Sequence, residues 1–196
     1  MSQINVDSLR HSSGNGSGID LQSNGDIAID ATTLYVDSAN NRIGINDSAP
    51  NATLEINGSE GLNINTAPIT EKFHTVSGTS NGNTSVDVLN SNVYFYTSAN
   101  TGNWTPNIRG DGSTTLDSLM DTGQVCLVTL ISQNGSSSGA AGSINVDGSG
   151  RTIEWLDGDA PSNRGGTDGY DVYQYTVIKN GSNSFLVFAN RTYCSN

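Results

Sequence analysis

The most constraining feature of this chain is a short apolar unit that recurs along its first third. Between residues 19 and 64, triplets with apolar first and third residues alternate with segments rich in Asn, Asp, Ser and Gly. A period of two predicts β-strands, and the intervening residues tolerate the positive φ angles of tight turns. The sequence therefore predicts six short strands, in a meander or a winding β-layer, at residues 19–21, 27–29, 34–36, 43–45, 54–56 and 62–64.

Each predicted strand offers only two apolar side chains to one face. Burying one Leu or Ile stabilises a fold by about 1.5–3 kcal/mol, whereas ordering the backbone of each residue costs about 1–2 kcal/mol. A single copy of this region therefore lacks a core of its own, but identical copies wrapped around a common axis would cover the apolar stripes and the strand edges. The expected oligomer core consists of Ile27, Ile29, Leu34, Val36, Ile43, Ile45, Leu54, Ile56, Leu62 and Ile64.

The character of the chain changes between residues 66 and 72, so we expect two regions, 1–70 and 71–196. The second region has longer apolar runs and most of the aromatic residues, which predict a β-sandwich or jelly-roll-like module. One or two helical turns are expected at residues 114–120, with Thr114 and Asp117 as a capping pair and Gly123 at the end. Strands are expected at 73–76, 84–89, 93–96, 125–131, 143–146, 152–155, 172–178 and 185–189.

Composition supports an all-β class and restricts the partners. Hydrophobic residues make up 34% and charged residues 14% of the 196 residues, and Gly, Asn, Ser and Thr dominate the rest. A net charge of −11 with eight Lys and Arg disfavours nucleic acid. Residues 1–20 lack the apolar core of a signal peptide and no run reaches the length of a membrane helix, so we expect no membrane insertion. We expect Cys126 to be a small core residue and no disulfide with Cys194.

Residues 41–58 resemble a repeat of phage tail fibres, in which an Asn-Arg-apolar-Gly-Ile-Gly-Thr run is followed by Pro and by Leu-x-Val-x-Gly. Here the run is Asn-Arg-Ile-Gly-Ile at 41–45, and it departs from the repeat at Asn46 and Asp47, so the turn there is expected to differ. Residues 1–9 are similar to the start of virion proteins of marine and cyanobacterial phages. Further segments similar to the C-terminal domain of such proteins lie at 93–96, 107–112, 116–123 and 173–178.

The resemblance implies a non-enzymatic structural protein of the virion, a homotrimeric fibre-like or decoration protein assembled in the host cytoplasm. Its residues 1–70 would trimerise and dock on other virion proteins, with residues 1–18 adapting to the attachment surface. The number three comes from the resemblance alone, and the repeat also occurs in adhesins. The C-terminal sandwich would face outward.

Two other functions stay open. A lectin-like adhesin would bind host surface glycans by stacking aromatic rings on sugars, although core or subunit packing explains the same rings better. A polysaccharide depolymerase would need catalytic carboxylates. The aromatic candidates for glycan contact are Tyr94, Tyr96, Trp104, Tyr170 and Tyr173.

Catalytic signatures match only formally. Residues 135–139 spell the Gly-x-Ser-x-Gly elbow of hydrolases, but the Gly-Ala-Ala-Gly that follows disfavours the required helix, and His11 and His74 both precede the motif. A glycosidase pair of Glu154 and Asp157 has no support, because sequence gives no separation for them. We therefore predict no catalytic residue and no cofactor.

Other motifs are better explained by turns. Four aspartates surround a Gly-rich loop and offer the oxygen ligands of a hard cation, but their spacing matches no known loop, so Asx turns explain them better. Residues 109–111 spell the Arg-Gly-Asp tripeptide of integrin ligands, which we assign to a tight turn. The four aspartates are Asp157, Asp159, Asp168 and Asp171, and we predict no metal site there.

Overall fold

The computed structural model describes residues 8–9, 18–29, 33–58, 62, 64, 67–156 and 158–195. Strands dominate this part of the chain, and its helix α1 (Leu116–Leu119) has four residues. The predicted all-β class is confirmed. The chain divides into two compact units, Met1–Ile69 and Thr70–Asn196.

The first unit contains one sheet of six short strands in the order β1 to β6. Strands β1 to β5 pair antiparallel with their neighbours, and β6 runs parallel to β5. The expected strand at 62–64 is not seen at Leu62 and Ile64, and residue 63 lies outside the described residues. The strands are β1 (Ser8–Leu9), β2 (Ile19–Leu21), β3 (Ile27–Ile29), β4 (Leu34–Asp37), β5 (Arg42–Ile45) and β6 (Leu54–Ile56).

The turns of this unit use the residues that the sequence supplies for them. Asn41 and Asn46 adopt φ angles of 55° and 57°, in the left-handed region that Asn tolerates. A side chain at Gly44 would collide with the backbone oxygen of Asp47, so the chain needs glycine there. The segment that departs from the fibre repeat therefore forms a close turn against β5.

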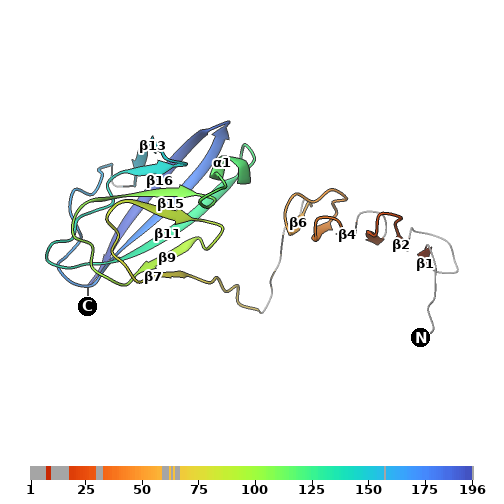
Figure 1. Ribbon diagram of the computed structural model, residues 1–196, viewed down its shortest axis with the longest axis horizontal. Helices are drawn as coiled ribbons and strands as arrows, with labels where there is room; N and C mark the ends of the chain where they lie inside the picture. The colour runs from red at the N-terminus through yellow and green to blue at the C-terminus, as the bar shows by residue number, and fades with distance from the viewer. Residues whose placement is uncertain are drawn as a thin grey trace. The chain divides into compact units, whose positions relative to one another are not determined.

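The second unit contains a six-stranded and a four-stranded sheet (Figure 1). The six-stranded sheet has the order β14-β16-β15-β11-β9-β7, and its strands are β7 (His74–Val76), β9 (Val93–Tyr96), β11 (Val125–Gln133), β14 (Ile153–Trp155), β15 (Tyr170–Gly181) and β16 (Ser184–Cys194). The four-stranded sheet has the order β13-β12-β10-β8, and its strands are β8 (Gly82–Asp87), β10 (Trp104–Arg109), β12 (Ile144–Val146) and β13 (Ser149–Arg151). Strands β10 and β13 were not predicted from the sequence.

Both sheets are mixed. Strands β11, β15 and β16 pair antiparallel, whereas β9 runs parallel to β11 and to β7, and β14 runs parallel to β16. In the other sheet, β10 runs parallel to both β8 and β12. Jelly rolls are antiparallel architectures, so these parallel pairs depart from that topology.

The inward faces of the two sheets share one apolar core. Trp104 of β10 packs edge-on against Tyr96 of β9 and Tyr173 of β15, with ring centroids 5.4 and 5.8 Å apart. Such edge-to-face pairs stabilise beyond their buried area. The remaining large members include Val86, Ile108, Leu116, Val128, Leu130, Ile144, Val146, Tyr175 and Val177.

Helix α1 begins one residue later than the sequence suggested. Its N-cap is Thr115, whose side chain accepts a hydrogen bond from the backbone N–H of Ser118. The prediction that Thr114 caps the helix with Asp117 is therefore wrong, because the Thr114 N–H instead donates to Asp111 in the preceding turn. Cys126 packs against the edge of the core, and both cysteines are free.

Candidate functional site

The first unit carries a continuous apolar row across its sheet. The pairing registers place Leu21 opposite Ile27, Ile27 opposite Val36, Val36 opposite Ile43 and Ile43 opposite Leu54. Directly paired residues project from the same face of a sheet. We call these five residues the apolar ladder. Two shorter rows share its face, namely Ile19, Ile29 and Leu34, and Ile45 and Ile56.

The apolar ladder is not buried within the single chain. Leu54 is 55% exposed, Leu21 44% and Ile43 41%, while Ile27 and Val36 are half-buried. Leu62 and Ile64, two further members of the expected oligomer core, are also exposed. Contiguous exposed apolar faces are typical of sites that bind another protein, a ligand or a membrane.

The opposite face of the same sheet is closed by the small residues Ala28 and Gly44, by Tyr35 and by a polar network around Asp26. The Asp26 carboxylate accepts hydrogen bonds from the Tyr35 hydroxyl at 2.5 Å, from the Ser38 backbone N–H at 2.7 Å and from the Asn24 amide at 2.7 Å. The Tyr35 and Ser38 hydrogen bonds lower the pKa of Asp26 to about 2. The sequence analysis did not predict this network. A single Tyr between the apolar residues Leu34 and Val36 was the one sequence feature that pointed to it.

The structure corrects the proposed glycan contacts. Tyr94, Tyr96, Trp104 and Tyr173 are all buried in the core of the second unit. Burial is the first cause of the raised pKa of the Tyr96 and Tyr173 hydroxyls. These four rings are therefore inaccessible for stacking on a sugar, and core packing explains them. Tyr170 is half-buried, and its ring packs 5.7 Å from that of Phe95.

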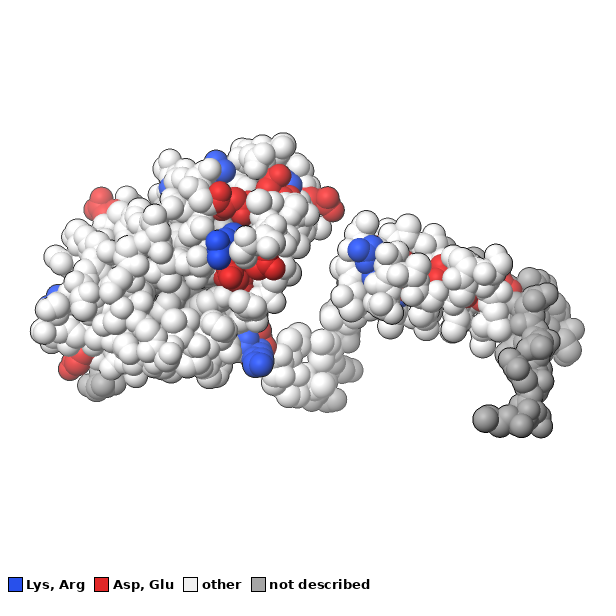
Figure 2. All heavy atoms as spheres, in the orientation of Figure 1, with Lys and Arg blue, Asp and Glu red and all other residues white. Residues whose placement is uncertain are grey.

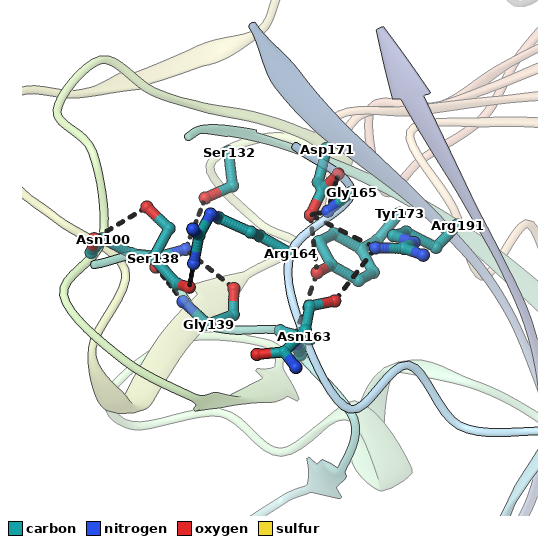
Figure 3. A network of polar contacts seen from close by, with 12 residues as sticks. Asn100, Ser132, Ser138, Gly139, Asn163, Arg164, Gly165, Asp171, Tyr173 and Arg191 are labelled. Atoms are coloured by element: carbon teal, nitrogen blue, oxygen red, sulfur yellow. Dashed lines mark hydrogen bonds and ion pairs between the residues drawn. The ribbon is translucent and has the colours of Figure 1, made fainter. Parts of the chain in front are cut away.

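A polar network at the start of β15 fixes the Gly-rich loop that precedes this strand (Figure 3). The buried Asp171 carboxylate accepts from the Gly165 N–H at 3.0 and 3.1 Å and lies 3.6 Å from the Arg191 guanidinium. Arg191 also donates to the Asn163 carbonyl, and Arg164 donates to the Ser138 carbonyl. The network ties the loop to the sheet, with Asp171 paired to Arg191 and Arg164 bound to a backbone carbonyl.

Three of the four aspartates considered as cation ligands are described, and each has different surroundings. Asp171 is buried and engaged as above, Asp168 accepts from the Tyr193 hydroxyl at 2.6 Å, and Asp159 is exposed. Asp157 lies outside the described residues, and so does the proposed pair that it would form with Glu154. In the part of the chain that the structure describes, no three His, Cys, Asp or Glu side chains gather as a metal site.

The serine of the formal hydrolase motif is a structural residue. The Ser138 hydroxyl donates to the Asn100 carbonyl and accepts from the Gly135 N–H, both at 2.8 Å, and the side chain is buried. His74 packs on Tyr94 with ring centroids 4.9 Å apart, and His11 lies outside the described residues. A loop-closing role explains Ser138.

The Arg-Gly-Asp tripeptide lies in a tight turn. Arg109 forms a 2.7 Å ion pair with Asp87 of the neighbouring strand. The Asp111 carboxylate accepts the backbone N–H groups of Ser113 and Thr114, and these hydrogen bonds lower its pKa. Both charged side chains are thus used within the fold.

The comparisons leave the family open. Neither family models nor curated proteins nor solved structures gave a match to this chain. Among the described residues, no helix combines the length and apolar character needed to cross a membrane.

Proposed function

We propose that this protein is a fibre-like or decoration component of a phage virion that assembles as a homotrimer through its first unit and displays its second unit. It acts by assembly and adhesion, without catalysis, and it is carried on the particle after assembly in the host cytoplasm. Residues 1–18, of which only Gly18 and the strand pair Ser8–Leu9 are described, are the proposed attachment segment to other virion proteins.

The observation that carries the proposal is the exposed apolar ladder. Its five side chains come from five successive strands and face the same way, and in the single chain three of them are exposed and two are half-buried. Identical ladders on three copies would cover one another around an axis, because each is long, narrow and free of charge. The number three and the virion setting rest on the resemblance of residues 41–58 to the fibre repeat.

A glycan-binding adhesin is the second candidate, and it has lost most of its support. Four of the five aromatic residues that it would use lie in the core. A depolymerase would need a pair of catalytic carboxylates. Of the pair considered, Glu154 and Asp157, the second lies outside the described residues. Neither alternative accounts for the apolar ladder.

Native mass measurement of the full chain tests the oligomer. We expect a species of three 20.5 kDa chains. The Leu54→Asp variant should weaken association at least tenfold, because each copy would then bring a carboxylate into the apolar contact. Ala52→Asp is the matched control, since it adds the same charge at an exposed position two residues away and off the ladder.

Three outcomes are informative. A trimer that Leu54→Asp dissociates and Ala52→Asp leaves intact supports the proposal. A monomeric parent chain at micromolar concentration would refute it. Equal effects of the two variants would show that net charge, rather than the ladder, controls association.

A further inference from the structure

One part of the outward face of the six-stranded sheet in the second unit is also apolar, beside a polar row of Thr129, Gln174 and Asn190. The registers align Leu127, Thr176 and Phe188 in one row and Val125, Ile178 and Leu186 in the next. These rows lie on the side opposite the core, since their neighbours along each strand, such as Val128, Val177 and Val187, are buried. We call these six residues the outer rows.

Four of the six outer-row residues are exposed in the single chain, and Thr176 and Ile178 are half-buried. Leu127 is 63% exposed and Phe188 43%, and Leu156, just after β14, is 75% exposed. Leu127, Leu156 and Phe188 lie among the residues that line a shallow hollow of about 620 Å³. A sheet with one solvated face normally alternates apolar and polar residues, whereas strands covered on both faces are continuously apolar. Strand β11 has the second pattern, from Val125 to Ile131, and so indicates a covered face.

Charge is nearly absent from this face, which limits what can cover it. Among the described outward positions of the six-stranded sheet, the one charged side chain is that of Glu154, on the edge strand β14. The charged pairs of the unit lie elsewhere, as with Arg109 and Asp87 or Lys179 and Asp117. Figure 2 likewise shows Lys and Arg beside Asp and Glu on part of the visible surface, with wide uncharged areas next to them.

A second copy of this chain is the occupant that fits these observations. Each chain carries a net charge of −11, so contact between copies is opposed by repulsion wherever the surface is charged. In the second unit, the outer rows are a surface on which copies could meet without that repulsion. The apolar ladder would also hold the second units of one oligomer at an effective concentration on the order of millimolar, at which a modest apolar contact suffices.

We propose that the outer rows form a second contact between copies, so that the second units associate through the outward face of their six-stranded sheets and not only through the first units. The identity of the occupant rests on the proposed oligomer. The contact would cover the face that β11 otherwise leaves in water.

Thiol protection in the full chain tests this contact. In a Cys126→Ala, Cys194→Ser background, Thr176→Cys places a probe in the middle of the outer rows, and Ile43→Cys places one on the apolar ladder. Ser149→Cys, on the exposed strand β13 of the other sheet, is the control for an open position. Maleimide should label Thr176→Cys at least tenfold more slowly than Ser149→Cys in the oligomer. Adding Leu127→Asp, at an exposed position that the fold tolerates, should remove that protection.

The two probes separate this inference from the proposed function. Protection at Ile43→Cys with rapid labelling at Thr176→Cys would overturn the second contact and leave the first-unit oligomer standing. Rapid labelling at both positions would overturn both. Protection at Thr176→Cys that Leu127→Asp leaves intact would also overturn the second contact. Protection that appears only when a panel of oligosaccharides is added would overturn it in favour of a glycan site.

Discussion

At the scale of single residues, Asp26 closes one face of the first sheet. Its carboxylate gathers hydrogen bonds from Tyr35, Ser38 and Asn24, which hold strand β4 and the turn after it against the turn before β3. That side of the sheet is therefore closed by polar contacts within the chain. The apolar ladder lies on the other side, where the proposed contacts between chains would form.

This arrangement predicts an acid-dependent loss of order in the first unit. The pKa of Asp26 is lowered from 3.8 to about 2, so the ionised carboxylate stabilises the folded unit fully above about pH 3.8, and the contribution is lost as the pH falls through about 2. Tyr35→Phe removes the largest cause and should raise the Asp26 pKa toward 3.8. An NMR titration of the Asp26 side chain and the Ser38 amide measures both effects.

The control for that titration is Asp47→Asn, which removes a carboxylate from the next turn, where Asp47 accepts the Ala49 N–H. It should leave the Asp26 titration where it is. An unchanged Asp26 pKa in Tyr35→Phe would contradict the assigned cause.

The sequence analysis named four of the five ladder residues as core candidates, without Leu21, and did not predict the polar network behind them. Alternating apolar residues identify a face directly, because the side-chain period of a strand is two. Asp26, by contrast, looked like an ordinary turn residue, and its partners Tyr35 and Ser38 follow nine and twelve residues later. Contacts of that kind depend on the strand register, which local patterns do not give.

At the scale of elements, helix α1 is held by a lysine from the distant strand β15. The buried Lys179 ammonium donates to the carbonyls of Asp117 and Met120 and lies 3.0 Å from the Asp117 carboxylate. The hydrogen bond from Lys179 is the first cause of the lowered pKa of Asp117. A helix of four residues has no stability of its own, so these contacts and the core position of Leu116 keep it in place.

Replacing this lysine should therefore destabilise the second unit. Lys179→Met keeps the apolar stem but leaves two carbonyls and a carboxylate without their donor, which costs about 1–3 kcal/mol. We expect the thermal midpoint to fall by several degrees, measured by circular dichroism. Lys72→Met, at an exposed lysine, is the control and should change the midpoint little. Equal midpoints for the two variants would contradict the anchoring role.

Strand β10 shows why some elements were missed. Pro106 lacks a backbone N–H, and proline in a run of residues argues against a central strand. In the structure β10 is central, but β12 pairs only with Asn107 and Ile108, after the proline, and the ring of Pro106 is buried in the core. The fold therefore accommodates the proline where one side of the strand is unpaired. Such an arrangement depends on the three-dimensional neighbours and is not encoded in the local pattern.

At the scale of the whole molecule, both units leave an uncharged apolar face exposed while the chain as a whole is strongly acidic. The charged surface and the apolar faces therefore have different effects on contact between chains. Acidic residues outside these faces keep the chain soluble and oppose unspecific contact, whereas the faces permit contact only with surfaces that match them. The all-β class follows from composition and periodicity, but the pairing of distant strands in the second unit does not.

This separation predicts how association responds to salt. If copies met through ion pairs, added salt would screen the attraction and dissociate the oligomer. Here the contacts proposed are apolar and the remaining electrostatic effect is repulsion between chains of charge −11, so salt should screen the repulsion and strengthen association. Sedimentation of the full chain between about 0.01 and 0.15 M salt tests this prediction, because the Debye length falls from about 30 to 8 Å over that range. The dissociation constant of the oligomer should fall severalfold as salt is added. The same series on Leu54→Asp should show a steeper dependence, because that variant adds a charge inside the contact. Dissociation of the parent oligomer by salt would mean that charged groups hold the copies together, and the apolar faces would then need another explanation.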